Sequence, residues 1–266
     1  MSNKKKTQLK EIDNEIKDKF NSSIYPPEKI ILKLSNTHEY FNNLMNFKVS
    51  LITRFCKDKT VLDLCCATGE FLFEINNLIK KGFGLDLSER YIEKANKTKI
   101  ERNLQKMEFN VGNARKLKFE NDTFDLIFCY SSLYLIPNVE IVIKEISRVL
   151  KTQGVAILDF GNYFSLNTIV CKAHTEIAKP YHLRIKQMKF MLKQAGFIII
   201  DSYAFQILPL WGGKPRWLKP LLHPIWKNLL EKQIGGKMID EWICNSPIFR
   251  AFAFRHIFVC KKINNP

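Results

Sequence analysis

Two aspartates stand at the ends of successive apolar segments, separated by about 20 residues, a spacing typical of nucleoside-binding sites. Asp63 lies in LDLCCATGEF, residues 62–71, and Asp86 lies in GFGLDLSER, residues 82–90. A carboxylate in the second position can accept hydrogen bonds from both hydroxyls of a ribose. Further on, Asn113 carries an amide that can donate and accept, which suits the edge of an adenine ring. These residue types predict a site for an adenosine-containing ligand.

The turn after the first aspartate is short of glycine. A dinucleotide loop has three glycines and places a diphosphate on a helix N-terminus, whereas this loop has Cys65, Ala67 and Gly69. Glu70 then opens the expected helix, and its carboxylate would repel a diphosphate but tolerate a ligand with a cationic centre. Cys65 and Cys66 are interpreted as small loop residues, because no histidine or cysteine lies at metal-ligand spacing and adjacent cysteines rarely bridge. No metal is expected.

Short apolar runs alternate with helical patterns from residue 60 onward, which predicts repeated β-α-β units. A helix is expected before them, over residues 38–55. Four more helices are expected over residues 69–81, 88–102, 139–150 and 185–194, with Ser88 as an N-cap. Strands are expected at Thr60–Leu64, Gly82–Leu87, Met107–Val111, Phe124–Tyr130, Val155–Phe160, Phe197–Phe205 and Phe252–Cys260.

The predicted fold is α/β: a doubly wound, Rossmann-like, seven-stranded and mostly parallel sheet whose last strand is antiparallel. Residues 1–37 are expected to form a polar N-terminal arm, either a loose helix or a disordered segment, and residues 38–266 the main domain. A helical insertion, residues 207–247, separates strands six and seven and contains all four tryptophans. Pro224 is expected to start a helix there, and Gly235 with Gly236 to end it.

Five segments together carry a family resemblance. VLDLCCATGEF, GLDLS, VGNA, FDLIFCYSSLYLIPN and RVLKTQGVAIL occur in the order and spacing of class I S-adenosylmethionine-dependent methyltransferases. The resemblance covers residues 38–206, with 252–260 as the last strand, and implies S-adenosyl-L-methionine as cofactor. The departure is the loop, where Cys65 and Ala67 replace glycines; a similar Cys-Cys version occurs among quinone-ring methyltransferases.

The resemblance also implies roles for individual residues. The methionine portion would be held by Asp63 and by the loop residues Cys65, Cys66, Ala67 and Gly69. Asp86 would bind the ribose, and the adenine would meet Leu87, Asn113 and Ala114. Tyr130 and Ser131 would close over the sulfonium. Three of these have simpler alternatives: Asp63 can tie down the turn, Asp86 can cap the following helix, and Asn113 can be an ordinary turn residue.

The methyl acceptor is less well defined. Transfer from a sulfonium mainly requires an oriented acceptor and exclusion of water, so a conspicuous catalytic residue need not exist. Tyr134 and His182 are the predicted catalytic residues. The predicted substrate contacts are Tyr134, His174, Trp211 and Trp217. A small-molecule, glycan or lipid-linked acceptor is expected, with the insertion as a lid.

Composition leaves other functions open. The chain of 266 residues has a formal net charge of +16 and seven cysteines at irregular spacing, and it begins with a charged segment. A cytoplasmic location is therefore expected, and the basic, tryptophan-bearing C-terminal region suits contact with a membrane surface. One alternative is an RNA methyltransferase, although the amino-methylating motif, Asn or Asp followed by Pro-Pro-Tyr, is absent after the fourth strand. The other alternative is a catalytically degenerate binding module. The oligomeric state is not predicted.

Overall fold

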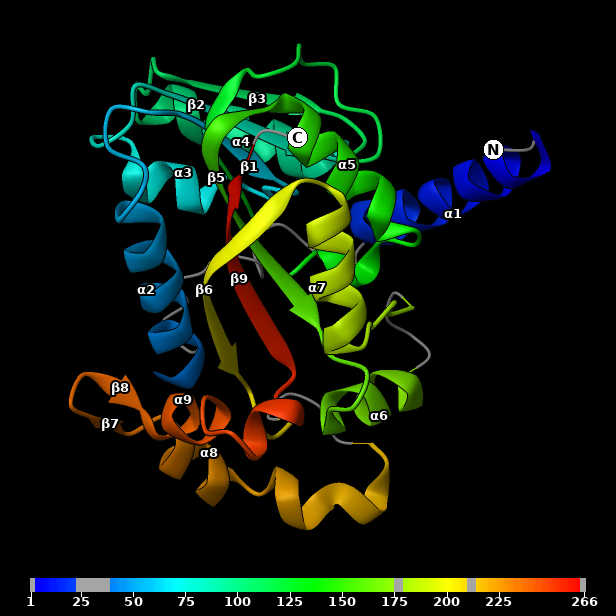
Figure 1. Ribbon diagram of the computed structural model, residues 1–266, viewed down its shortest axis with the longest axis vertical. Helices are drawn as coiled ribbons and strands as arrows, with labels where there is room; N and C mark the ends of the chain where they lie inside the picture. Colours follow the sequence, from blue (N-terminus) through cyan, green and yellow to red (C-terminus); the bar gives the residue numbers. More distant parts are fainter. Residues whose placement is uncertain (1–2, 23–38, 175–178, 210–213, 264–266) are drawn as a thin grey trace.

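A seven-stranded sheet organises the chain (Figure 1). The computed structural model describes residues 3–22, 39–174, 179–209 and 214–263. The strand order is β3-β2-β1-β4-β5-β9-β6, and only β9 pairs antiparallel to its neighbours. The predicted doubly wound sheet is thereby confirmed. The strands are β1 Thr60–Leu64, β2 Lys81–Asp86, β3 Met107–Val111, β4 Phe124–Cys129, β5 Leu150–Gly161, β6 Phe197–Phe205 and β9 Arg255–Lys262.

Helices cover both faces of the sheet because its strands are apolar on both sides. One face packs against α2 (Glu39–Thr53), α3 (Glu70–Ile75) and α4 (Glu89–Glu101). The other packs against α5 (Val139–Val149) and α7 (Ile185–Gln194). The expected helix over 69–81 is too long, since α3 ends at Ile75, and the seventh strand begins at Arg255 rather than at residue 252. A further helix, α6 (Leu166–Ala173), was not predicted.

The N-terminal segment is more ordered than a loose arm. Residues Asn3–Asn21 form one helix, α1. Its apolar side chains Leu9, Ile12, Ile16 and Phe20 recur at helical spacing, and Leu9 is buried. Phe20 contacts the ring of Tyr91 on α4 edge to face. This stripe holds an otherwise polar helix against the domain, because its burial removes apolar surface from water.

The insertion contains two α-helices, the first of which starts at Pro224 as expected. They are α8 (Pro224–Leu230), with proline in the first turn, and α9 (Ile239–Cys244). Gly235 and Gly236 do not end α8; they form the two-residue turn between β7 (Gln233–Ile234) and β8 (Lys237–Met238). Both glycines have positive φ, as a tight hairpin turn of the I′ kind requires. In Figure 1 the insertion lies at the lower end of the molecule.

The strand order reverses between β1 and β4. The chain adds β2 and β3 on one side of β1, then crosses to β4 and β5 on the other. Ligands of doubly wound sheets bind at such a switch point, beyond the carboxyl ends of the strands. The loops that follow β1, β2 and β4 therefore meet where a ligand site is expected. Among the described helices, none has the length and hydropathy needed to cross a bilayer.

Candidate functional site

A cavity of about 250 Å³ opens at this switch point. Its walls come from the carboxyl ends of β1, β2 and β4, from α2 and α3, and from the N-terminal helix α1. Ten of the predicted site residues line it: Asp63, Cys65, Cys66, Ala67, Asp86, Leu87, Asn113, Ala114, Tyr130 and Ser131. Sequence patterns therefore located just under half of the cavity wall, and the predicted Gly69 is not part of it. The roles assigned to these residues stay predictions.

The loop after β1 has the left-handed backbone conformation that glycines favour, although two of its three left-handed positions are not glycine. Cys65, Ala67 and Gly69 all have positive φ, at 62°, 47° and 86°. A Cβ atom at Gly69 would lie 2.6 Å from the Phe109 ring, so this position needs glycine for space as well as for conformation. Cys65 and Ala67 are strained, because a left-handed residue with a Cβ costs about 1–2 kcal/mol.

This strain predicts that the substitution Ala67→Gly raises stability. Glycine adopts the left-handed conformation freely, so relief of strain should exceed the added entropy of the unfolded chain by about 0.5 kcal/mol. The expected change is a melting temperature higher by roughly 1–2 °C. As a matched control, Ala95→Gly in the middle of α4 should lower it. A lower melting temperature for Ala67→Gly would contradict the strain argument.

Asp86 fixes the position of this loop. Its Oδ2 accepts a hydrogen bond from the Ala67 N–H at 2.9 Å, and its Oδ1 accepts one from the Ser88 N–H at 2.9 Å. Ser88 in turn caps α4 through its hydroxyl. A carboxylate has about four lone-pair sites, so these bonds leave Asp86 capacity to accept from a ligand that enters the cavity. The simpler role of Asp86 at the start of α4 is therefore compatible with ligand binding.

Asp63 carries an unsatisfied oxygen. The side chain is 2% exposed, and its buried Oδ2 has no hydrogen-bond partner among the described residues. Burial, together with the nearby charges of Asp86 and Glu70, raises the pKa of the Asp63 carboxyl well above its usual value. A buried polar atom without a partner is uncommon and calls for a ligand that supplies one. A cationic or hydrogen-bond-donating ligand group would meet that need.

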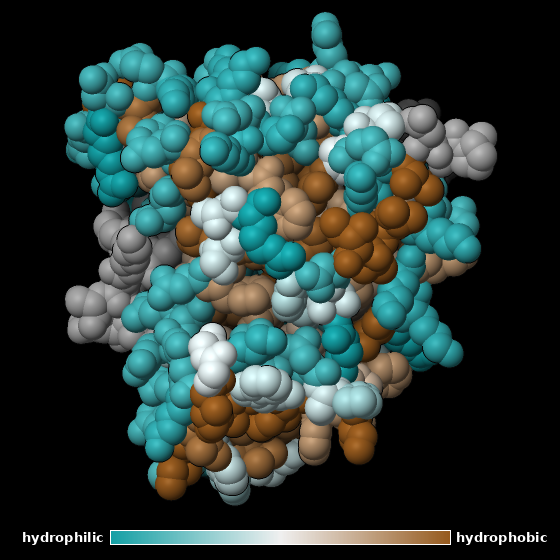
Figure 2. Space-filling view, turned by 60° about the vertical axis from the view of Figure 1, so that its left-hand side comes forward, coloured by the Kyte–Doolittle hydropathy of each residue, from teal (hydrophilic) through white to brown (hydrophobic). Residues whose placement is uncertain are grey.

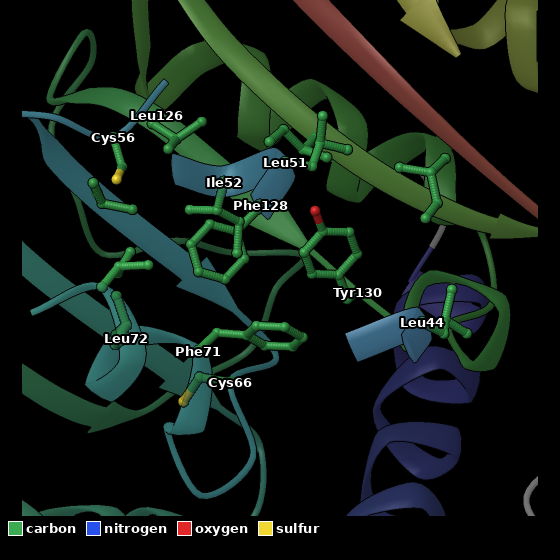
Figure 3. Close-up of a cluster of buried hydrophobic side chains, with 14 of the residues drawn as sticks. Leu44, Leu51, Ile52, Cys56, Cys66, Phe71, Leu72, Leu126, Phe128 and Tyr130 are labelled. Atoms are coloured by element: carbon green, nitrogen blue, oxygen red, sulfur yellow. The ribbon is translucent and has the colours of Figure 1, made fainter. Parts of the chain in front are cut away.

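The aromatic wall lies between α3 and β4. Phe71 packs against Tyr130 at 5.1 Å between ring centroids, and Figure 3 shows Phe71 and Phe128 gathered around the Tyr130 ring, with Cys66 near Phe71. Burial, with smaller contributions from Asp63 and Asp86, raises the pKa of the Cys66 thiol, which keeps it neutral. This part of the cavity is apolar and excludes water from whatever it encloses.

The N-terminal helix reaches the cavity, which the sequence analysis missed. Asp13, Ile16 and Phe20 line it. The Asp13 carboxylate accepts a hydrogen bond from Asn113 Nδ2 at 2.7 Å and pairs with Arg115. In the sequence, the helical spacing of Ile16 and Phe20 indicated a helix face that packs against the domain.

Asn113 is already engaged on both sides of its amide. Besides the bond to Asp13, its Oδ1 accepts the Arg115 N–H at 2.9 Å, which is the turn role considered as an alternative. A ligand base would have to use the remaining N–H or lone pair, or displace Asp13.

The predicted acceptor residues lie outside the cavity wall. Tyr134 and His182 pack together with ring centroids 5.9 Å apart. His182 Nδ1 is 2.7 Å from Thr168 Oγ1, and burial lowers its pKa to about 4, so its ring is neutral near pH 7. His174 follows α6, and Trp217 is exposed in the 3-10 helix Arg216–Leu222. Trp211 lies outside the described residues.

A buried ionic cluster behind Ser131 was also missed by the sequence analysis. Lys48 on α2, Asp159 on β5 and Arg255 on β9 converge there. Asp159 pairs with Arg255 at 2.5 Å and with Lys48 at 3.4 Å, and Lys48 and Asp159 are 2% and 0% exposed. No spacing in the sequence signals this cluster, because the sheet order brings its members together.

Comparison with known proteins identifies relatives of this arrangement. The family model described as a methyltransferase domain matches residues 56–231. A demethylmenaquinone methyltransferase of Lactococcus lactis is 34% identical over 139 residues, covering 48% of this chain and 55% of the relative. One from Oceanobacillus iheyensis is 30% identical over 153 residues, covering 54% and 58%. The chain thus spans little more than half the length of these relatives.

Solved structures share the fold at lower identity. Phosphoethanolamine N-methyltransferase 2 of Haemonchus contortus, in complex with S-adenosyl-L-methionine, superposes with a TM-score of 0.64 at 16% identity, over 94% of this chain and 60% of that one. The YcgJ protein of Bacillus subtilis superposes with a TM-score of 0.58 at 16% identity, over 83% and 100%. At these identities the likeness concerns the fold alone.

Proposed function

We propose that this protein transfers a methyl group to a small or lipid-linked acceptor in the cavity at the switch point. The premise is that the chain belongs to the class I S-adenosylmethionine-dependent methyltransferase family. The observation that carries this proposal is that Asp63 and Asp86 lie in one cavity wall. Asp63 has an unsatisfied oxygen, and Asp86 has remaining capacity to accept a hydrogen bond. An adenosyl sulfonium with its amino acid portion offers matching groups.

The residues present fit that cofactor. Asp86 would accept hydrogen bonds from the ribose hydroxyls. Asp63 would pair with the cationic amino group of the methionine portion, which would give its unpartnered Oδ2 a hydrogen bond. Leu87 and Ala114 would offer apolar contact to the adenine, and Tyr130 would lie on the methyl-bearing side. When bound, S-adenosylmethionine supplies an electrophilic methyl group on a sulfonium. The chain's own contribution is to orient the acceptor and keep water out with the Phe71–Tyr130 wall.

Asp63 should make cofactor binding depend on pH. Its raised pKa means that the free protein retains a proton on this buried carboxyl at pH values where an exposed aspartate is charged. An ammonium group pairs only with the charged form, so binding expels the proton, and affinity should rise with pH until the pH exceeds the raised pKa. Calorimetry at one pH in two buffers of different ionisation enthalpy should detect proton release.

The variant Asp63→Asn is the control for that measurement, because it keeps the shape of the side chain but cannot titrate. Proton release should disappear in this variant, and cofactor affinity should fall. Proton uptake by the wild type, or release that persists in Asp63→Asn, would contradict the role proposed for Asp63.

The relatives named demethylmenaquinone methyltransferases support a small-molecule acceptor for this chain as well. An exposed apolar surface near the insertion supports a lipid-linked one. Figure 2 shows brown side chains gathered at the lower end of its face, at the height of the insertion in Figure 1. We define the insertion surface as the exposed apolar residues of the insertion, which are Trp217, Leu221, Ile225, Trp226, Leu229, Ile234 and Trp242.

Basic residues accompany the insertion surface, since residues 207–247 carry 6 basic and 3 acidic side chains. Such a combination favours contact with an anionic membrane surface. Sedimentation with vesicles of anionic lipid should therefore retain the protein, and neutral vesicles or high salt should release it. Equal retention by neutral vesicles would contradict the electrostatic part of this proposal.

Incubation with methyl-labelled S-adenosylmethionine and fractionated cell extract tests the activity. Label is expected in the small-molecule or lipid fraction, and the variant Asp86→Ala should abolish it. Label in RNA would favour the alternative function. No transfer together with no cofactor binding would favour a degenerate binding module.

A further inference from the structure

Ser131 occupies a strained position at the edge of the cavity. It follows β4, lines the cavity and has φ +60°, a conformation rare for a residue with a side chain. Its backbone N–H donates to Asp159 Oδ2 at 3.1 Å, which holds the strained conformation in place. Such strain persists only where the surroundings impose it, and it concentrates at functional sites.

The Ser131 hydroxyl accepts two hydrogen bonds from cations. Lys48 Nζ lies 3.0 Å and Arg255 Nη1 lies 2.9 Å from Ser131 Oγ. A hydroxyl has two acceptor lone pairs and one proton, so both lone pairs are occupied and the proton alone is left to donate. No described residue accepts that proton. Because Ser131 lines the cavity, the proton is free to donate to a molecule inside it.

The charges behind Ser131 do not cancel while Lys48 is protonated. Two cations, Lys48 and Arg255, share the single carboxylate of Asp159 in a buried environment. Burial and the charge of Arg255 lower the pKa of Lys48 to about 7, as expected where positive charge is in excess. Tyr130 and Tyr134 also face the cluster, and burial raises the pKa of both, so they are neutral. A negative oxygen near Ser131 would be stabilised.

We propose that Ser131 donates a hydrogen bond to an anionic oxygen of the methyl acceptor, and that Lys48 and Arg255 are positioning residues that act through Ser131. The acceptor class is therefore a phenol or enol that binds as its oxyanion. This inference rests on the proposed function and names the acceptor chemistry of the same site.

With the acceptor bound as its oxyanion, methyl transfer needs no general base from the protein. The acceptor gives its hydroxyl proton to water before it is enclosed. An electron pair on its oxygen, or on the carbon conjugated with that oxygen, forms the new bond to the methyl carbon. The carbon–sulfur bond breaks and its electron pair stays on sulfur. When carbon is methylated, the hydrogen on that carbon is afterwards lost to water.

A chromogenic phenol tests the oxyanion site without turnover. We would bind 4-nitro-1-naphthol, whose oxyanion has its own visible absorption band, to protein saturated with S-adenosylhomocysteine. The fraction of bound naphthol that is ionised should exceed that of free naphthol at the same pH, corresponding to a tenfold or larger shift of its ionisation equilibrium. In Ser131→Ala and Lys48→Met this shift should shrink at least fivefold, and Lys48→Arg should restore part of it.

Controls separate this inference from the proposed function. Lys144→Met removes an exposed lysine on α5 and should leave the naphthol spectrum unchanged. Cofactor affinity should stay within threefold in Lys48→Met, because Lys48 does not line the cavity, and thermal melts report whether each variant is folded. Naphthol that does not bind, binds neutral, or keeps its shift in both variants would overturn the oxyanion site, whereas loss of cofactor binding in the wild type would overturn the proposed function itself.

Discussion

The substitution Asp86→Ala is expected to weaken binding of S-adenosylmethionine at least 100-fold. Two effects add: the ribose hydroxyls lose a charged acceptor, and the loop after β1 loses the bond from the Ala67 N–H that holds it against β2. Hydrogen bonds to charged groups contribute about 1.5–3 kcal/mol each, and about 1.4 kcal/mol corresponds to a tenfold change in affinity. Isothermal titration calorimetry measures the dissociation constant directly.

Asp125→Ala is the matched control for this variant. Asp125 also accepts a backbone hydrogen bond, from the Thr60 N–H at 2.9 Å, and it also lies in the sheet, but it does not line the cavity. We expect it to lower stability and to leave cofactor affinity unchanged. If Asp86→Ala bound the cofactor within threefold of the wild type, or if both variants lost affinity equally, Asp86 would not be the ribose ligand.

The second large effect is expected on stability, from Arg255→Met. Arg255 is 9% exposed and neutralises Asp159, which is fully buried and has a second oxygen, Oδ1, without a described partner. Removing Arg255 leaves Asp159 paired with Lys48 alone and takes the donor from buried acceptors on Ser131, Tyr134 and Gln206, a loss of about 3–5 kcal/mol. For a chain of this size the melting temperature should fall by roughly 10 °C. Denaturant unfolding followed by circular dichroism gives the free energy.

A double variant tests the reason for that loss. Asp159→Asn combined with Arg255→Met removes both charges, and Lys48, whose pKa burial already lowers to about 7, can then lose its proton. The double variant should therefore regain part of the stability lost in Arg255→Met, because the Asp159 carboxylate that needs a donor is gone. A loss below 1 kcal/mol in the single variant, or simple addition of the two single effects in the double, would show that the cluster is not a coupled buried ion network.

Local patterns in the sequence sufficed to predict the sheet. Each parallel strand is a short apolar run bounded by a turn, and parallel strands place their carboxyl ends at one edge, so Asp63 and Asp86 could be assigned to one site before the structure was known. The left-handed turn at Cys65 and Ala67 could be predicted only by analogy with glycine-containing loops, since neither residue type favours that conformation.

The cluster behind Ser131 was out of reach of such reasoning. Lys48 lies 83 residues before Ser131, and Arg255 lies 124 residues after it. They meet because β9 inserts between β5 and β6 and because α2 packs across β4, which are properties of the whole topology. Nothing in the composition near Lys48 distinguishes it from the many exposed lysines of this basic chain.

The contact of the N-terminal helix with the cavity was missed for a different reason. Charged residues dominate the helical segment, and a polar helix of this length is marginal on its own in water. Its order depends on packing, because Phe20 contacts Tyr91 and Asp13 contacts Asn113. The apolar spacing of Leu9, Ile12, Ile16 and Phe20 indicated a buried face, but it did not indicate that this face borders the cavity.

A crystal structure of the protein with S-adenosylhomocysteine tests the central claim most directly. The ligand is expected in the cavity at the switch point, with its ribose hydroxyls on the Asp86 carboxylate and its amino group paired with Asp63. Well-defined ligand at another site, or a ligand in this cavity that leaves the buried oxygen of Asp63 without a partner, would contradict the account.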